Sequence, residues 1–283
     1  IFHPFPLGRY ALHFSPDQFQ DYVCNNLKID FTERDKNIKT YDSLDADYII
    51  DCRGTPKNFD QYENLINPLN CALLSDLPKK ENDVKWTRAI ATPDGWCFYI
   101  PLPTKTSIGY IFNKKITSIA KATKNFKQLF KINKVNHVFP FHQYMAKEPI
   151  IDRRVLLNGN RLFFLEPLEA TAMGTYLRVS KCYYSYIFEN HSKKQTEELI
   201  KDYIDKTQNF ILYHYSNYSL YRNKFWKHAK KLYNKTPTQI LDKELKIIKG
   251  MSDVDLHRTF DRNNEFALWP PFSIKQWHDK VAS

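Results

Sequence analysis

Glycine is scarce in this sequence of 283 residues, and its seven copies are widely spaced. A dinucleotide-binding fold cradles a pyrophosphate with a GxGxxG turn between its first strand and first helix. No two of these glycines lie close enough together to form that turn, which excludes it within these 283 residues. The glycines are Gly8, Gly54, Gly95, Gly109, Gly159, Gly174 and Gly250.

Cysteine is sparse as well, and paired CxxC spacings are absent. An odd number of scattered cysteines favours reduced thiols over a disulfide framework or a zinc site. We therefore expect no metal site and a reducing, cytoplasmic setting. The five cysteines are Cys24, Cys52, Cys71, Cys97 and Cys182.

Long apolar runs and an excess of acidic residues are also missing. No stretch approaches the roughly 20 apolar residues that span a bilayer, and no secretory leader opens the chain, so we expect no membrane partner. The chain begins at Ile1 without an initiator Met, from which we expect a start within a longer protein. The net charge is +11, compatible with an acidic carrier or an anionic cofactor. No nucleic-acid-binding motif accompanies it, so we expect no nucleic-acid partner.

Apolar residues are plentiful enough for a folded core, at 42% hydrophobic and 15% aromatic. Apolar spacing after a serine and a proline predicts a helix over Ser15–Leu27. A buried strand is predicted at Tyr48–Cys52, and two strands flank a turn at Pro103–Thr106. The pattern from Lys193 to Tyr233 is helical. This order predicts an α/β or α+β fold with a helical C-terminal lobe.

The segment FFLEPLEATAMGTYL, from Phe163 to Leu177, places two carboxylates and a proline at a predicted helix start. Backbone N–H groups at a helix start lack partners within the helix and can hold an anion. Pro167 suits a first turn, Thr171 could add a hydroxyl, and Glu169 would stand beside them as an acid or base. Ordinary helix chemistry, in which Glu is favoured in the first turn, explains the same residues.

Six segments resemble, in the same order, segments of FAD-dependent tryptophan halogenases. GNRLFFLEPLEATAMGTYL resembles the family's flavin-binding and halide-binding segment, and DADYIIDCRG resembles the strand that leads to the flavin. ATPDGWCFYIPL resembles the Gly-Trp-x-Trp-x-Ile-Pro signature. YALHFSPDQF, GYIFN and FILYHYSNYSLYRNKFW resemble further segments. The resemblance implies an FAD/NAD(P)-binding, flavoprotein-monooxygenase-like fold with a β-sheet substrate region and a helical C-terminal lobe.

The resemblance also implies a division of the chain and an activity. Residues 1–56 and 152–190 would belong to the FAD-binding domain, 57–151 to a β-rich region covering flavin and substrate, and 191–283 to a helical C-terminal region. Family members use reduced FAD from a separate flavin reductase, with O2 and a halide ion, and need no metal. They halogenate an electron-rich aromatic ring of the tryptophan or indole kind. Whether the substrate here is free or carrier-bound, and the oligomeric state, stay open.

Each residue that matches a family motif inherits an expected role. Glu169 matches the catalytic glutamate, and Thr171 with the backbone of Ala172 matches the halide site. Trp96, Phe98 and Pro101 match the strand that separates the flavin site from the substrate site. The positions expected to contact the flavin are Gly159, Asn160, Glu166, Pro167, Cys52 and Gly54.

Several positions depart from the family's pattern. Arg53 replaces a threonine, Phe98 replaces the second tryptophan, and Arg161 replaces a small residue. Ala170 and Ala172 stand in place of Ser and Gly. Because the GxGxxG turn and the motif of the catalytic lysine are also absent, we expect the C-terminal portion of a longer halogenase. The alternatives are a related flavin monooxygenase and a non-catalytic, halogenase-like remnant.

Overall fold

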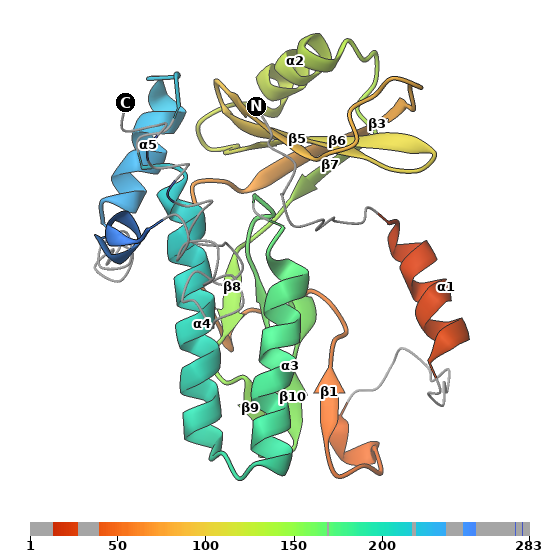
Figure 1. Cartoon of the computed structure of the whole chain (residues 1–283), viewed down its shortest axis with the longest axis vertical. Coiled ribbons are helices and arrows are strands. Elements are labelled where there is room, and N and C mark those ends of the chain that lie inside the picture. The colour runs from red at the N-terminus through yellow and green to blue at the C-terminus, as the bar shows by residue number, and fades with distance from the viewer. Residues whose placement is uncertain are drawn as a thin grey trace.

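A computed structural model describes residues 14–27, 40–168, 170–216, 219–235 and 246–252, together with residues 275 and 279. Three sheets and the five labelled helices α1 to α5 lie within these residues. A five-stranded sheet with one helix on its outer face occupies one end of the molecule, and two long helices run side by side at the other (Figure 1). The fold is mixed α/β, as predicted.

A parallel strand pair forms the centre of the first sheet. β1 (Ile49–Asp51) pairs in parallel with β10 (Val155–Leu157), and β10 pairs antiparallel with β9 (Ile150–Ile151). The register places Asp51 opposite Leu157, so the two parallel strands end at the same edge of the sheet. This confirms the strand predicted at 48–52 and sets the glycine turn that follows it beside the end of β10.

The largest sheet has five antiparallel strands in the order β4-β5-β6-β3-β7. The strands are β3 (Cys71–Pro78), β4 (Arg88–Thr92), β5 (Gly95–Pro101), β6 (Lys105–Phe112) and β7 (His137–Pro140). The predicted pair of strands around residues 103–106 is confirmed as the β5–β6 hairpin. α2 (Ile119–Phe130) packs Phe126 against Tyr110 and Phe112, which gives this sheet its own apolar core.

A third, small sheet accompanies the two sheets described above. β8 (Tyr144–Ala146) pairs with both β2 (Tyr62–Asn64) and β11 (Phe163–Phe164). β11 is only two residues long and leads directly into the segment before the third helix. The short helices η1 (Tyr41–Ser43) and η2 (Gly159–Arg161) precede β1 and β11.

The helices differ in how much of their surface is buried. α3 (Ala172–Phe188) and α4 (Lys193–Tyr213) pack against each other and share the main core (Figure 1). α4 ends at Tyr213 and α5 (Lys224–Tyr233) begins at Lys224, so the helical pattern predicted from 193 to 233 corresponds to two helices. Asn223 caps α5, because its side-chain oxygen accepts from the N–H groups of Phe225 and Trp226.

α1 (Pro16–Asn26) confirms the predicted N-terminal helix. Ser15 and Gln18 form a reciprocal capping box, with Ser15 Oγ accepting from Gln18 N–H and Gln18 Oε1 accepting from Ser15 N–H, both at 3.2 Å. None of the residues of this helix is buried. Among the described residues, no helix combines the length and the apolar character that crossing a membrane requires.

Candidate active site

The chain enters α3 through a tight turn. Ala170 N–H donates to the Pro167 carbonyl at 3.0 Å, and Ala170 has φ 51°, a left-handed conformation that costs a non-glycine residue about 1–2 kcal/mol. Because this conformation is incompatible with a right-handed helix, α3 starts only at Ala172. The prediction that Pro167 lies in the first helical turn is therefore wrong. Glu169 itself lies outside the described residues.

Thr171, matched to the halide site, is buried at the N-cap of α3. Its carbonyl accepts from both the N–H and the hydroxyl of Thr175, each at 2.9 Å, whereas its own side chain caps no N–H of the helix. The first turn also contains no acidic residue. The N–H groups at this helix start, beginning with Ala172, thus keep their partial positive charge, which suits a small anion.

Glu166 is the most deeply buried carboxylate near this turn. It is 1% exposed, and its two oxygens accept from Tyr215 Oη at 2.6 Å and Trp96 Nε1 at 3.2 Å. Burial raises the pKa of Glu166 to about 7, and the hydrogen bonds from Tyr215 and Trp96 oppose that rise. This cluster ties together β5, the segment before α3, and the end of α4.

Only one end of the signature strand β5 contacts the cluster around Glu166. Trp96 is buried and contacts Glu166, and Phe98 packs its ring over Gly109, where a Cβ atom would come within 2.2 Å of the ring. A larger residue at position 109 would therefore displace the Phe98 ring from this position. Pro101 ends the strand, five residues from Trp96 and roughly 16 Å away along an extended chain. The structure thus brings Trp96, but not Pro101, to the segment before α3.

The edge where β1 and β10 end has the geometry expected for a ligand that approaches the backbone. Gly54 (φ 81°) and Gly159 (φ 59°) both adopt left-handed conformations, and a Cβ atom on either would meet nothing within 4 Å. Cys52 is exposed beside them. Ligands of open α/β sheets bind outside the carboxyl ends of parallel strands, so these three residues fit a flavin at this edge.

Two other positions expected to contact the flavin are engaged within the protein. Asn160 Oδ1 accepts from Tyr176 Oη at 2.6 Å, and its carbonyl accepts from Tyr144 Oη at 2.7 Å. Glu166 uses both oxygens in the cluster described above. Pro167 is exposed. Direct flavin contacts by these three residues stay predictions.

An ion cluster around the buried Asp51 at the same edge was missed from the sequence. Asp51 accepts from Tyr41 Oη at 2.6 Å and from Arg53 Nη2 at 2.8 Å, and Arg161 Nε lies 3.2 Å from the same carboxylate. Burial alone would raise the pKa of Asp51, but the hydrogen bonds from Arg53 and Tyr41 outweigh it and lower the pKa to about 2. Both arginines are departures from the family's pattern. The available signal in the sequence was that arginine replaces the family's usual residue at both positions.

Tyr215 was also missed as a member of the cluster around Glu166. Its only sequence signal was the His-Tyr pair in the segment from Phe210 to Trp226. Trp226 is itself buried, and its Nε1 donates to the Thr92 carbonyl at 2.8 Å, which joins the start of α5 to the end of β4. Residue separations of 49 and 134 positions explain why spacing could not reveal these contacts.

Known proteins share both this sequence pattern and this fold. Among curated proteins, the chain is 24% identical over 268 residues to tryptophan 7-halogenase KtzQ from Kutzneria sp. strain 744, a match that covers 80% of this chain and 49% of KtzQ. Among solved structures, it is similar to SttH, a tryptophan 6-halogenase from Streptomyces toxytricini, with a TM-score of 0.63 and 17% identity over 83% of this chain and 48% of SttH. BrvH, a flavin-dependent halogenase from Brevundimonas sp. BAL3, gives a TM-score of 0.60 at 17% identity, over 84% of this chain and 56% of BrvH.

The chain spans about half the length of the relatives it matches. The similar structures show the fold. The sequence also matches the family described as tryptophan halogenase over residues 30–268, which is most of its length. The chain therefore belongs to the tryptophan halogenase family.

Proposed function

We propose that the complete protein is a flavin-dependent halogenase that uses reduced FAD, O2 and a halide ion to halogenate an electron-rich aromatic substrate of the tryptophan or indole kind. The observation that carries this proposal is the junction at α3. There a strained Ala170 and a buried Thr171 directly follow the Glu169 position and lead into an uncapped helix start. Family membership makes this junction the natural place for halide and acid–base chemistry.

The flavin would lie against the edge formed by the ends of β1 and β10, beside Cys52, Gly54 and Gly159. The two glycines support this because they leave open space that a side chain would fill. When bound, reduced FAD supplies the electrons that activate O2 for oxidation of the halide. This chain contributes the backbone edge and the nearby positive charge of Arg53 and Arg161.

The halide would be held by the N–H groups at the start of α3, around Thr171 and Ala172. These groups are unpaired within the helix, and the first turn carries no acid that would repel an anion. Thr171 is buried, so an anion there would be largely shielded from water and strongly attracted.

Glu169 would orient the oxidised halogen or accept the proton that the aromatic ring loses on substitution. The cluster of Trp96, Glu166 and Tyr215 supports this role. It fixes the backbone three residues before Glu169 to a strand and to a second helix. A catalytic group carried on a turn needs such support to hold its geometry.

The remaining assignments follow from the same proposal. Residues 40–56 and 152–190 would contribute to the FAD-binding domain, with residues 1–39 of its expected first segment largely outside the described residues. Residues 57–151 would cover flavin and substrate, and 191–283 would form the helical region. A separate flavin reductase would supply reduced FAD. The five free cysteines support a reducing, cytoplasmic setting.

The test is to measure product mass in the complete protein, supplied with a flavin reductase and either chloride or bromide. Glu169→Gln should reduce halogenation by at least about 100-fold, the usual scale for a lost general base, with FAD affinity nearly unchanged. Glu189→Gln at the other end of α3 is the matched control and should retain turnover. Undiminished halogenation by Glu169→Gln would remove this residue from the mechanism.

One observation favours a second candidate, a halogenase-like protein without catalysis. Arg53 and Arg161 stand where the family has smaller residues, and both are committed to Asp51 beside the flavin edge. Failure of the complete protein to bind FAD would support this reading. A product that gains oxygen irrespective of the halide supplied would instead indicate a related flavin monooxygenase.

A further inference from the structure

The cluster of Asp51, Arg53 and Arg161, at the edge where β1 and β10 end, carries more positive than negative charge. The carboxylate of Asp51 is buried there, and two guanidinium groups lie within ion-pair distance of it. Arg53 Nη2 is 2.8 Å from Asp51 Oδ2, and Arg161 Nε is 3.2 Å from the same oxygen. Because one carboxylate neutralises one guanidinium, these three side chains together keep a surplus of positive charge.

Arg53 is the cation that Asp51 holds most closely. Its Nε donates to Asp51 Oδ1 at 3.0 Å and its Nη2 donates to Oδ2 at 2.8 Å, so the two planar groups meet at two points. The Arg53 guanidinium also lies over the Tyr41 ring, 5.2 Å from its centroid. Two-point pairs of this kind are stronger than single contacts, so the charge of Asp51 is largely satisfied by Arg53.

Arg161 approaches the same carboxylate without forming such a pair. Its Nε atom is buried and has no hydrogen-bond partner, although it lies 3.2 Å from Asp51. The side chain of Arg161 is 27% exposed, so part of it reaches the surface at this edge. An ion pair without a hydrogen bond leaves the guanidinium able to contact a second anion, and the surplus positive charge is therefore that of Arg161.

The backbone of Arg161 is held beside open space. Arg161 N–H donates to the Asn158 carbonyl at 3.2 Å, and the Arg161 carbonyl accepts from Tyr62 Oη at 2.9 Å. Two residues earlier, a Cβ atom on Gly159 would meet nothing within 4 Å. Ligands of open α/β sheets bind outside the carboxyl ends of parallel strands, which is this edge. A charged ligand bound here would therefore come near Arg161.

We propose that Arg161 binds a negatively charged group of the flavin cofactor at this edge. The inference rests on the proposed function, and it adds a contact at a position where the family has a small residue. Two groups of FAD offer that charge, namely its pyrophosphate and its ring system in the reduced state. A guanidinium binds phosphate oxygens in pairs, and a positive charge beside the reduced ring stabilises that state over the oxidised one.

Anaerobic titrations of the complete protein and of its Arg161→Gln variant test this contact. The probes are FAD and riboflavin, each oxidised and reduced, because riboflavin has the ring without the pyrophosphate. A pyrophosphate contact predicts that Arg161→Gln weakens FAD binding about ten-fold or more in both states and leaves riboflavin unchanged. A ring contact predicts the same loss for the reduced form of both flavins only. Unchanged affinity for all four ligands, or weaker binding of oxidised riboflavin, would overturn the proposal.

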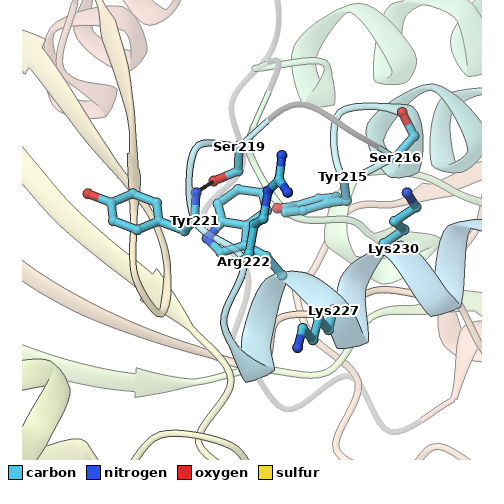
Figure 2. A pocket seen from close by; sticks show the side chains of 8 residues that line it. Tyr215, Ser216, Ser219, Tyr221, Arg222, Lys227 and Lys230 are labelled. Carbon is cyan, nitrogen blue, oxygen red and sulfur yellow. Dashed lines mark hydrogen bonds between the residues drawn. The ribbon is translucent and has the colours of Figure 1, made fainter.

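A second group of cations provides the matched control. Arg222 and Lys227 line a pocket with Tyr215 between α4 and α5 (Figure 2), and the start of α5 lies well apart from β1 (Figure 1). Arg222→Gln removes the same charge there and should change the affinity for each flavin by less than about two-fold. Equal weakening by Arg222→Gln and Arg161→Gln would indicate the general positive charge of the protein and would overturn the contact.

Two further variants keep the test valid if Arg161→Gln folds poorly. Arg161→Lys keeps a positive point charge, whereas Arg161→Met keeps only the aliphatic stem. The Arg161→Lys protein should bind the affected flavin at least about three-fold more tightly than the Arg161→Met protein. Equal affinity in these two proteins, both shown by circular dichroism to be folded, would mean that the flavin does not need this charge.

The same titrations separate this inference from the proposed function. Absence of flavin binding to the wild-type complete protein would contradict the proposed function and this inference together. Flavin binding that ignores the charge at position 161 would overturn this inference alone.

Discussion

At the scale of single residues, Glu166 is the feature whose environment differs most from expectation. It was expected to face the flavin, yet both of its oxygens accept hydrogen bonds from Trp96 and Tyr215 in the interior. A buried carboxyl is easier to protonate because ionisation in a low dielectric is unfavourable. The hydrogen bonds that hold the turn before α3 in place therefore depend on whether the Glu166 carboxyl is protonated.

Glu166→Gln tests this link through the pH dependence of stability. The pKa of Glu166 is raised from 4.5 to about 7 by burial, so its contribution is fully present below pH 4.5 and is lost as pH rises through about 7. The free energy of unfolding of the wild-type protein should fall by on the order of 3 kcal/mol across that window from this group. Glu166→Gln cannot ionise and should lack the fall.

Chemical denaturation between pH 4.5 and 8 measures this difference. The matched control is Glu198→Gln, because the side chain of Glu198 is 66% exposed on α4. That variant should follow the wild-type pH profile. If both variants follow it equally well, Glu166 is not the titrating group.

At the scale of elements, the end of β1 is joined to the segment after β10 by one carboxylate. Asp51 holds Arg53 from its own turn and Arg161 from η2, and its carbonyl accepts from Asn158 N–H at 3.0 Å. The two arginines that depart from the family's pattern are thus partners of the same buried group. We infer that they occur together because the carboxylate of one aspartate can form an ion pair with both.

Asp51→Asn tests this connection between the two strands. The substitution leaves two guanidinium groups without their shared carboxylate and should lower the free energy of unfolding by about 2 kcal/mol at neutral pH. The pKa of Asp51 is lowered to about 2, so its contribution is present above pH 3.8 and is lost as pH falls through about 2.

The control for Asp51→Asn is Asp76→Asn, whose ion pair with Lys105 is exposed. That substitution should cost less than about 0.5 kcal/mol, because surface ion pairs contribute little. Urea denaturation at neutral pH gives both values. Equal costs would show that Asp51 acts as an ordinary surface acid.

At the scale of the whole molecule, the candidate site is assembled from three separate parts of the fold. The large sheet supplies Trp96, the parallel strand pair supplies the open edge at Gly54 and Gly159, and the helix pair supplies Thr171 at the start of α3 (Figure 1). Flavin binding should therefore stabilise the complete protein as a unit, since it would contact several parts at once.

Gly159→Ala tests the flavin edge in the complete protein. A Cβ atom at this position meets no protein atom within 4 Å, so its space is available to a ligand. The thermal shift caused by FAD should shrink, and FAD affinity should fall about ten-fold, because the methyl group occupies ligand space. Without FAD, the strain at φ 59° should cost only about 1 kcal/mol.

Gly250→Ala is the matched control, because a Cβ atom there also meets nothing within 4 Å. Its FAD affinity should equal that of the wild type. An undiminished FAD shift in the Gly159→Ala protein would place the flavin elsewhere.

The sequence by itself determined the local elements and the family. Apolar spacing located α1, β1 and the β5–β6 hairpin, because side-chain periodicity follows directly from backbone geometry. Motif order identified the halogenase family before any contact was known. Residues such as Glu169 and Thr171 could be matched because family motifs are contiguous in the chain, although their roles stay predictions.

Only the tertiary structure decided which side chains meet. Trp96, Glu166 and Tyr215 are separated by 70 and 49 positions, and no local pattern reports contacts over such distances. The start of α3 was also misplaced, because the left-handed Ala170 overrides the usual preference of proline for a first turn. Local physics sets the elements, whereas burial and the pairing of distant polar groups decide how those elements form a site.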